Sequence, residues 1–386
     1  MPGENALRTR LGDGDGSRIW TIPVGAGALT SSAGRYQFAE ALKMDNEMLE
    51  NVLSMEKGTR VLVTGATGFT GSLLVRKLAA AGLKVHAIAR PSSNILPFQD
   101  LNIRWFRGQV FDPETVRAAI AGTRFVFHLA AAYREAKLSY DDYLRAHVTS
   151  TQLLADAAAN MNEFARFVHI STVGVHGHID GPPANEESPF CPGDDYQKTK
   201  AEGERWLRDF AGRHNLDYTV IRPAGIYGPG DKRLLKVFKM ATWPVFPLLG
   251  KGRCLYHLIH VEDLTDAIII AATHASASSQ SFICGNPEAI PLEVMGKCIA
   301  HACGCKFRPM RLPAWPFFAA GAFCEGLCRP LGIEPIIYRR RVAFYTKDRS
   351  FDTRKLQNML GYRVRFSNDE GLRATARWYR DAGWLK

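Results

Sequence analysis

The sequence has 386 residues, of which 46% are hydrophobic, and this length predicts two or three domains with ample apolar surface for a core. A net charge of +11 favours anionic ligands, but the basic residues are scattered and carry no aromatic-basic nucleic-acid motif, so we exclude nucleic acid as a partner. Eight cysteines without the usual spacing of zinc ligands argue against a metal site, and no apolar run approaches the ~20 residues of a transmembrane segment.

Residues 1–57 differ in character from the rest of the chain and form an N-terminal extension. Residues 1–34 are rich in Gly, Ser and Thr, which is typical of a flexible leader, and 36–55 have the loose apolar face of a helix. The segment lacks the charged and apolar regions of a secretory signal, so we expect free thiols and a cytoplasmic location. The extension is either a docking arm or the result of a start codon chosen too far upstream.

A strand, a glycine-rich turn and a helix then follow one another. Residues 60–64 form a β-branched run typical of a buried parallel strand, and 70–81 have the apolar spacing of a helix. Between them, three glycines allow a tight turn, a close approach to a pyrophosphate and close packing of helix on strand: Gly65, Gly68 and Gly71. Because the start of a helix offers free N–H groups and a partial positive charge, this turn predicts a dinucleotide-binding site.

Strands and helices alternate from residue 58 onward, which predicts an α/β fold with a doubly wound parallel sheet of the Rossmann type. Further strands are expected at 84–89, 103–107, 125–129, 166–171 and 218–222. Further helices are expected after Asp112 and at 141–160, 196–210 and 263–274.

After Gly230, aromatic residues, prolines and basic residues replace the regular alternation. We therefore expect a dinucleotide-binding Rossmann domain at 58–230, rejoined by 255–285. The remaining segments, 231–254 and 286–386, would form a smaller substrate-binding lobe over the carboxyl ends of the strands, where ligands bind in open α/β sheets.

Two groups of polar residues lie at or after the C-terminal end of the predicted fifth strand. On a helix, Tyr196 and Lys200 share a face, and a nearby ammonium lowers the pKa of a phenol. Tyr196 is therefore a candidate acid and base toward an alcohol or ketone oxygen, and Lys200 can also reach ribose hydroxyls. The hydroxyls of Ser171 and Thr172 can bond to a substrate carbonyl. The alternatives are a surface helix and a strand-end turn without function.

With these motifs in view, the chain resembles the extended short-chain dehydrogenases/reductases of the NAD-dependent epimerase/dehydratase type. The matching segments occur in family order at 64–71, 128–131, 171–177, 196–200, 222–230 and 260–264. The resemblance implies hydride transfer between a secondary alcohol carbon and nicotinamide C4. It implies that Tyr196 gives and takes the proton with Lys200 as its partner, while Thr172, or else Ser171, holds the reacting oxygen. The implied cofactor contacts are Gly65, Thr67, Gly68, Phe69, Thr70, Gly71, Arg90, Gln109, Val110, Leu129, Ala130, Ala131, Tyr196, Lys200, Pro223 and Ile226.

Three positions depart from the family pattern. The acidic residue that holds an NAD ribose after strand 2 is absent and Arg90 follows instead, so we expect NADP(H) in preference to NAD(H). After the third strand, Gln109 and Val110 replace the usual Asp-Leu, and Gln109 can still bond to adenine. His147 replaces a family asparagine that helps order the site, which argues against a simple proton relay.

The substrate class stays open at this point. A nucleotide sugar or related small molecule would suit the basic residues expected near the site: Arg233, Lys236, Lys251 and Arg253. Hydroxysteroid-like, dihydroflavonol-like or other lipidic substrates would suit the apolar segment 312–320, which could equally be core or rest on a membrane surface.

Two other functions remain as alternatives, a nucleotide-sugar epimerase or dehydratase and a non-catalytic dinucleotide-binding sensor or scaffold. The intact Tyr196 and Lys200 argue against the second. We expect a small-molecule substrate, no metal, a homodimer, and at most a peripheral contact with membranes.

Overall fold

The computed structural model describes residues 55–132, 138–179, 181, 183–250, 252–328, 342 and 348–385. Three features expected from the sequence lie outside these residues: the leader, Lys251, and the helix at 36–55 apart from Met55. No helix in the described part of the chain is long and apolar enough to cross a membrane.

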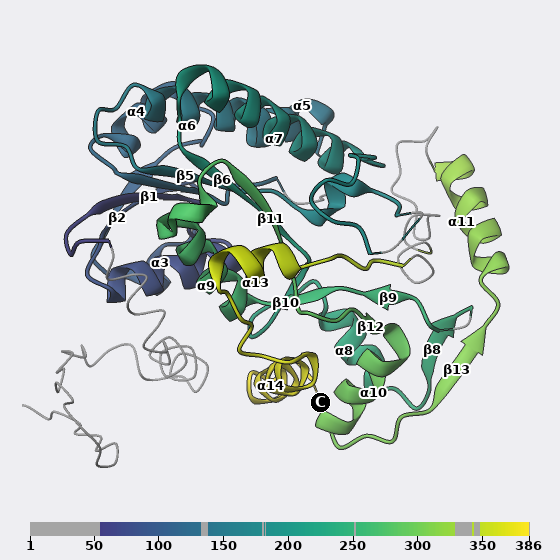
Figure 1. Ribbon diagram of the computed structural model, residues 1–386. Helices are drawn as coiled ribbons and strands as arrows, with labels where there is room; N and C mark the ends of the chain where they lie inside the picture. Colours follow the sequence, from purple (N-terminus) through teal and green to yellow (C-terminus); the bar gives the residue numbers. More distant parts are fainter. Residues whose placement is uncertain are drawn as a thin grey trace, which may run out of the picture.

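Within the described residues, seven strands form one parallel sheet in the order β11-β6-β5-β4-β1-β2-β3 (Figure 1). The strands are β1 (Arg60–Thr64), β2 (Lys84–Ala89), β3 (Ile103–Arg107), β4 (Phe125–His128), β5 (Arg166–Ile170), β6 (Tyr218–Pro223) and β11 (Gln280–Cys284). The strand order reverses between β1 and β4, so their carboxyl ends border the crevice where such sheets bind ligands. The predicted doubly wound α/β fold is confirmed, and β11 adds a strand that the sequence analysis does not name.

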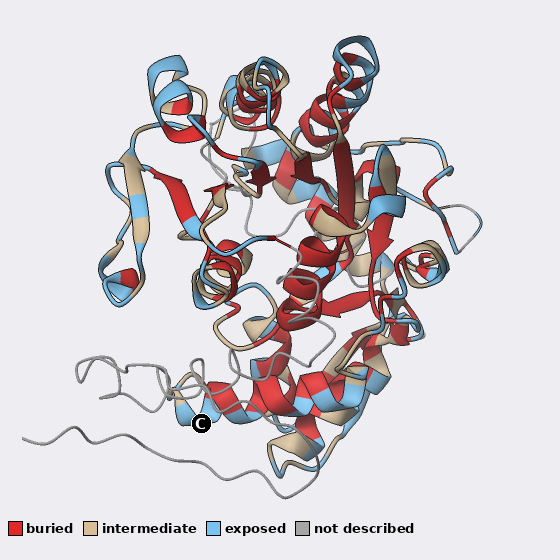
Figure 2. Ribbon diagram, turned by 60° about the vertical axis from the view of Figure 1, so that its left-hand side comes forward, coloured by how far each residue is buried: buried red, intermediate tan, exposed pale blue. Residues whose placement is uncertain are grey.

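Helices cover both faces of the sheet, and apolar side chains fill the two layers between (Figure 1). On one face lie α4 (Pro113–Ile120), α6 (Ser150–Ala159) and α7 (Asp195–His214). On the other lie α3 (Phe69–Ala80) and α9 (Val261–Thr273). Local signals set the helix ends: Asp112 caps α4 by accepting from the Thr115 N–H at 3.2 Å, and Pro113 occupies its first turn. Figure 2 shows the resulting pattern, with buried strands at the centre and helices exposed on their outer faces.

A second apolar core lies away from the sheet, among α8 (Leu235–Ala241), α10 (Leu292–Ala302) and α14 (Asn368–Asp381). Short strands pair around it: β7 (Gly225–Tyr227) with β10 (Leu258–His260), β8 (Phe246–Leu249) with β13 (Pro309–Leu312), and β9 (Leu255–Tyr256) with β12 (Ile290–Pro291). Helix α11 (Trp315–Cys328) follows β13.

The C-terminal part of the chain does not stay with this second core. Helix α13 (Arg354–Leu360) falls inside the segment expected to form the lobe, yet its Leu356 and Leu360 belong to the core of the sheet. Helix α13 therefore packs on the sheet, and the assignment of 286–386 to a separate lobe stays a prediction. The physical reason for this packing is that β11 is the edge strand of the sheet, and apolar side chains of α13 bury those of β11.

The single helix expected at 141–160 is divided in the structure. Helix α5 (Tyr140–Leu144) passes into a π-helical turn at Arg145–Thr149 and then into α6. The turn lies against α7, where a Cβ on Gly203 would be only 2.6 Å from the His147 carbonyl oxygen. Glycine at 203 therefore lets α7 approach the widened turn. This contact joins residues that are distant in sequence, so the spacing of apolar residues along the chain does not predict it.

A buried ion network joins α3, α9 and the C-terminal segment. Lys77 is 1% exposed, and its ammonium contacts the Asp266 carboxylate and, at 2.8 Å, that of Glu262. Arg365 reaches the same Asp266 at 2.5 Å. Removing one partner of such a group leaves the others buried without compensation.

Lys77→Met should therefore lower the free energy of unfolding by about 3–5 kcal/mol, because the Glu262 and Asp266 carboxylates would stay buried. Urea denaturation measures this change. Lys84→Met, at an exposed position of β2, serves as the control and should stay within about 0.5 kcal/mol of the parent. Equal stabilities of the two variants would show that the network contributes little.

Candidate active site

The glycine turn at 64–71 depends on two close backbone approaches. Gly65 has a φ of +71°, and a Cβ there would lie 2.9 Å from the Ala130 nitrogen. A Cβ on Gly71 would lie 2.1 Å from the Gly65 carbonyl oxygen. Gly68, the N-cap of α3, supplies no side-chain cap, so the first N–H groups of the helix stay available to an anion. The tight turn and the uncapped N-terminus of α3 together fit the pyrophosphate of a dinucleotide, because they offer free N–H groups at the carboxyl end of β1.

Buried hydrogen bonds tie this turn to the end of β4. Thr64 Oγ1 accepts from the Ala130 N–H at 3.1 Å and lies 2.8 Å from His128 Nδ1. His128 Nε2 lies 3.1 Å from Thr151 Oγ1, which already donates to the His147 carbonyl oxygen. His128 therefore donates from Nε2 and accepts at Nδ1. Burial lowers the pKa of His128 to about 3, so the imidazole is neutral at pH 7.

Two arginines lie at the carboxyl ends of neighbouring strands. Arg90 follows β2 and is exposed, and Ala89 before it is in register with Arg107, the last residue of β3. The Arg107 guanidinium donates to the Ser93 carbonyl oxygen at 3.1 Å and thereby holds the loop that follows Arg90. Gln109 is exposed beside them. This edge offers the positive charge that a ribose 2′-phosphate needs.

Tyr196 and Lys200 lie in the first turns of α7. The helix is capped by Asp194, whose carboxylate accepts from the Gln197 N–H at 2.9 Å. Tyr196 is half-buried, whereas Lys200 is 3% exposed and donates from Nζ to the Ile170 carbonyl oxygen at the end of β5. Burial lowers the pKa of Lys200 to about 8, and the Glu204 charge opposes that shift. The lysine thus remains mostly an ammonium at pH 7, fixed between helix and strand.

The two hydroxyls after β5 have different partners. Thr172 Oγ1 accepts from the Gly174 N–H at 3.1 Å, which leaves its O–H to donate to another oxygen. Ser171 is 4% exposed, and its Oγ has no hydrogen-bond partner within the described residues. A buried hydroxyl in this state is costly unless a ligand or water satisfies it.

His147, in the π-helical turn, connects three parts of the site. Its Nε2 accepts from the Ala132 N–H at 3.1 Å. Its Nδ1 lies 2.8 Å from Thr199 Oγ1, and because that hydroxyl donates to the Asp195 carbonyl oxygen, Nδ1 is the donor. The ring meets Tyr196 edge-on, with centroids 5.2 Å apart. Burial lowers the pKa of His147 to about 2, so this residue orients its neighbours as a neutral imidazole.

A fully buried ion pair anchors α7 behind these residues. Arg222 of β6 and Glu204 of α7 are both 0% exposed, and Arg222 Nε lies 3.1 Å from a Glu204 carboxylate oxygen. Arg222 also donates to the Glu186 carbonyl oxygen at 2.9 Å and lies over the Phe190 ring. These contacts hold the helix, and with it Tyr196 and Lys200, at a fixed height above the sheet.

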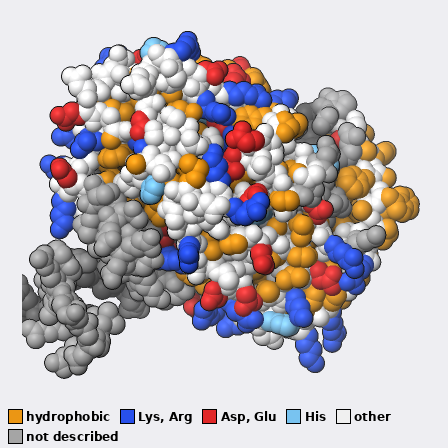
Figure 3. Space-filling view, viewed as in Figure 1, with side chains coloured by type: hydrophobic (Ala, Val, Ile, Leu, Met, Phe, Trp, Pro, Cys, Tyr) orange, Lys and Arg blue, Asp and Glu red, His pale blue; other side chains and the backbone are white. Residues whose placement is uncertain are grey.

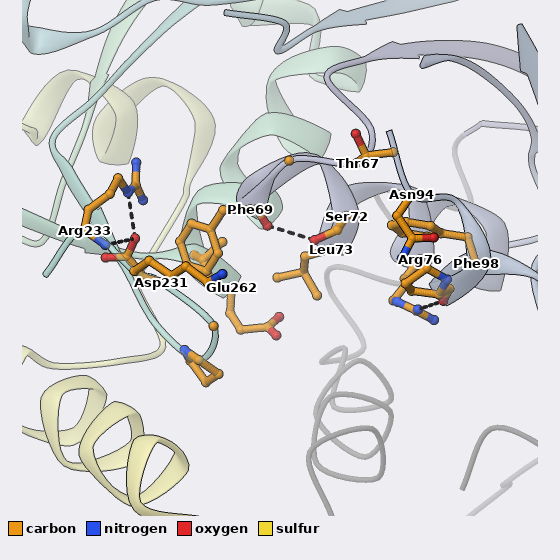
Figure 4. Close-up of a pocket in the computed structure, with 16 residues that line it drawn as sticks. Thr67, Phe69, Ser72, Leu73, Arg76, Asn94, Phe98, Asp231, Arg233 and Glu262 are labelled. Atoms are coloured by element: carbon orange, nitrogen blue, oxygen red, sulfur yellow. Dashed lines mark hydrogen bonds and ion pairs between the residues drawn. The ribbon is translucent and has the colours of Figure 1, made fainter. Parts of the chain in front are cut away.

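A hollow of about 630 Å³ opens on another side of the glycine turn (Figure 4). It shares Thr67, Gly68 and Phe69 with the expected cofactor contacts, but neither Tyr196 nor Lys200 lines it. Its wall includes Arg233, which bonds to Asp231 at 2.6 Å and lies over the Phe69 ring. Arg233, one of the cations considered for a nucleotide sugar, is therefore engaged within the protein.

The structure brings most of the sequence-predicted residues to one edge of the sheet. Val110, Leu129 and Pro223 lie at or just beyond the carboxyl ends of β3, β4 and β6, and Ile226 lies in β7. Sequence reasoning missed the contacts of Thr64 and Arg107, although the position of each at a strand end is a signal that it could have used. Together these groups can hold a dinucleotide and exchange a proton with an oxygen placed beside Tyr196.

A model of the NAD dependent epimerase/dehydratase family matches residues 61–285. A dTDP-glucose 4,6-dehydratase of Streptomyces niveus is 29% identical over 341 residues, covering 83% of this chain and 93% of that protein. The sterol demethylase protein B of Methylococcus capsulatus is 36% identical over 175 residues, covering 45% of this chain and 53% of that protein. Among solved structures, MoeE5 in complex with UDP-glucuronic acid and NAD has a TM-score of 0.66 and 26% identity over 84% of this chain and 99% of that chain.

Gly71→Ala should weaken binding of reduced nicotinamide dinucleotide about tenfold or more, because the added Cβ would push the Gly65 carbonyl and deform the cradle. Nicotinamide fluorescence titration measures the affinity. Gly212→Ala is the control, since that glycine is also helical and a Cβ there meets nothing within 4 Å. Unchanged affinity in Gly71→Ala would contradict the assignment of the cradle.

Proposed function

The chain belongs to the NAD-dependent epimerase/dehydratase family, and on that basis we propose that it is an NAD(P)-dependent oxidoreductase that interconverts a secondary alcohol and a ketone. The observation that carries the proposal is the buried Lys200 ammonium, fixed one helical turn from Tyr196 at the carboxyl end of β5. That pair lies at the same edge of the sheet as the glycine cradle, so a dinucleotide and an alcohol can meet there.

The residues of this site act on the substrate oxygen. A bound nicotinamide would accept hydride from the carbon that bears this oxygen, or donate hydride to it. In alcohol oxidation, Tyr196 takes the hydroxyl proton as the carbon loses hydride. The Lys200 ammonium favours the phenolate form of Tyr196 that this step requires. In ketone reduction, Tyr196 returns the proton to the oxygen. The Thr172 O–H, or that of Ser171, donates to the same oxygen and fixes its position, and His147 holds the Tyr196 ring.

The absence of an acidic ribose clamp supports net reduction or oxidation over internal recycling of the cofactor. An epimerase or dehydratase must retain its nicotinamide through two opposite hydride transfers, and a tightly held NAD suits that cycle. Arg90 and Arg107 favour a 2′-phosphate, and NADPH suits a reductase that exchanges its cofactor at each turnover.

Two substrate classes follow from different features. A nucleotide sugar or related small substrate is supported by the likeness to a dTDP-glucose 4,6-dehydratase and by the positive charge of the chain. A hydroxysteroid-like or other lipidic ketone or alcohol is supported by the likeness to a sterol demethylase protein B and by the engagement of Arg233 with Asp231, which removes one cation from phosphate binding.

Tyr196→Phe should reduce turnover by about two to four orders of magnitude while cofactor affinity stays unchanged, because only the proton-transferring oxygen is lost. The measurement is nicotinamide absorbance during incubation with a panel of ketones, hydroxysteroids and nucleotide sugars. Tyr140→Phe, which removes an exposed phenol at the start of α5, serves as the control.

One nicotinamide consumed per product would support the proposed net reaction. Product formed without added cofactor and without net absorbance change would indicate an epimerase or dehydratase. Near-normal turnover of Tyr196→Phe on the active substrate would exclude Tyr196 as the acid and base.

Arg90→Asp should shift the affinity ratio of NADPH to NADH by about 10- to 100-fold toward NADH, as expected for loss of a charge-assisted hydrogen bond worth about 1.5–3 kcal/mol. Fluorescence titration of both cofactors gives the ratio. Arg117→Asp, at an exposed position of α4, controls for the change in net charge. A parent protein that prefers NADH would show that Arg90 does not bind a 2′-phosphate.

A further inference from the structure

Helix α11 exposes apolar side chains and buries its only charged residue. Its exposed positions follow one helical stripe: Trp315, Ala319, Ala322, Phe323, Gly326 and Leu327. Trp315 and Phe323 are each 73% exposed and Leu327 is 58% exposed, whereas Glu325 is only 7% exposed. This pattern is the reverse of α14, whose exposed positions carry Asp369, Arg373 and Arg377. A helix that packs on a core and faces water would show the α14 pattern.

Further exposed apolar side chains lie on or near the pair of strands that precedes the helix. Met310 of β13 is 41% exposed, and Trp243 and Val245, just before the paired strand β8, are 53% and 40% exposed. Figure 1 places α11 and β13 along one margin of the molecule, and Figure 3 shows hydrophobic side chains gathered at the margin where α11 lies. A concentration of exposed apolar side chains along one margin is typical of an interaction site.

The charges that flank this surface are mainly positive. The stretch from residue 306 to residue 324, which includes β13 and most of α11, has three Lys and Arg residues and no Asp or Glu. Lys306 and Arg308, before β13, are exposed. Arg311, within β13, is exposed as well. The exposed face of α11 is thus apolar, with basic residues nearby and its carboxylate buried. Such a face complements a partner that has an apolar interior beneath an anionic outer layer.

We propose that α11 docks this protein on the surface of an anionic phospholipid bilayer, with the helix lying in the plane of the interface. The helix is 14 residues long, about 21 Å at 1.5 Å per residue, which is shorter than the ~30 Å hydrocarbon core, so it lies on the bilayer and does not span it. Trp315 has the ring that favours the interface, and the flanking cations meet the lipid phosphates.

A second copy of the chain fits this surface less well. A two-fold contact between copies brings the same patch of each into contact, so the basic flanks would face one another. A bilayer of anionic lipid instead attracts those flanks. The proposal is independent of the reaction assigned above, because it concerns residues that do not line the site at Tyr196.

Co-sedimentation of the full chain with vesicles tests this proposal. The chain should bind vesicles of phosphatidylcholine and phosphatidylglycerol, and added salt or omission of phosphatidylglycerol should weaken binding. The double variant Trp315→Ser and Phe323→Ser should lose about tenfold or more of the bound fraction. The matched control is Leu96→Ser, which removes a side chain that is 65% exposed on a different surface.

Thermal unfolding and cofactor titration of the double variant test whether it remains folded, and both should match the parent because α11 makes no part of the cofactor cradle. Absence of binding to anionic vesicles would overturn the proposal, as would equal binding of the double variant. A chain that sediments as a dimer without lipid, and as a monomer in the double variant, would show that a second copy covers α11 instead.

Discussion

The close approach of the glycine turn to the end of β4 is the contact on which the site depends. The Gly65 backbone lies so near Leu129 and Ala130 that a single Cβ would meet their main-chain atoms. On the other side, where α3 packs on the turn, a Cβ on Gly71 would meet the Gly65 carbonyl in the same way. These two contacts place the N-terminus of α3 at the strand crevice, and without them the helix would point its free N–H groups elsewhere.

Behind this edge lies a layer of buried polar residues that keeps one cation in place. Burial lowers the pKa of His128, His147 and His169, and the charge of Lys200 disfavours their protonation further. The imidazoles are therefore neutral, and the ammonium of Lys200 carries its positive charge at a fixed position among them. Hydrogen bonds of His128 and His147 then join the glycine turn, the loop after β4 and the start of α7 into one support. Such a support fixes the positions of Tyr196 and Lys200 without itself moving protons.

The proposed active site and the proposed docking surface lie in different parts of the molecule. The residues of the site lie at the carboxyl ends of the sheet strands, whereas α11 follows β13 on the other core and exposes apolar groups. A change in the α11 stripe should therefore not deform the glycine turn.

The sequence by itself determined the parallel sheet, the glycine turn and the capped start of α4, because each depends on residues that are neighbours in the chain. It could not determine the π-helical turn at Arg145–Thr149, the return of α13 to the sheet, or the placement of Arg107 beside the loop after Arg90. These features depend on contacts between segments far apart in sequence. The apolar segment 312–320 was compatible with a core, a pocket or a surface, since composition does not report burial. Only the tertiary structure decided that its Trp315 faces outward, because burial depends on what the rest of the chain packs against it.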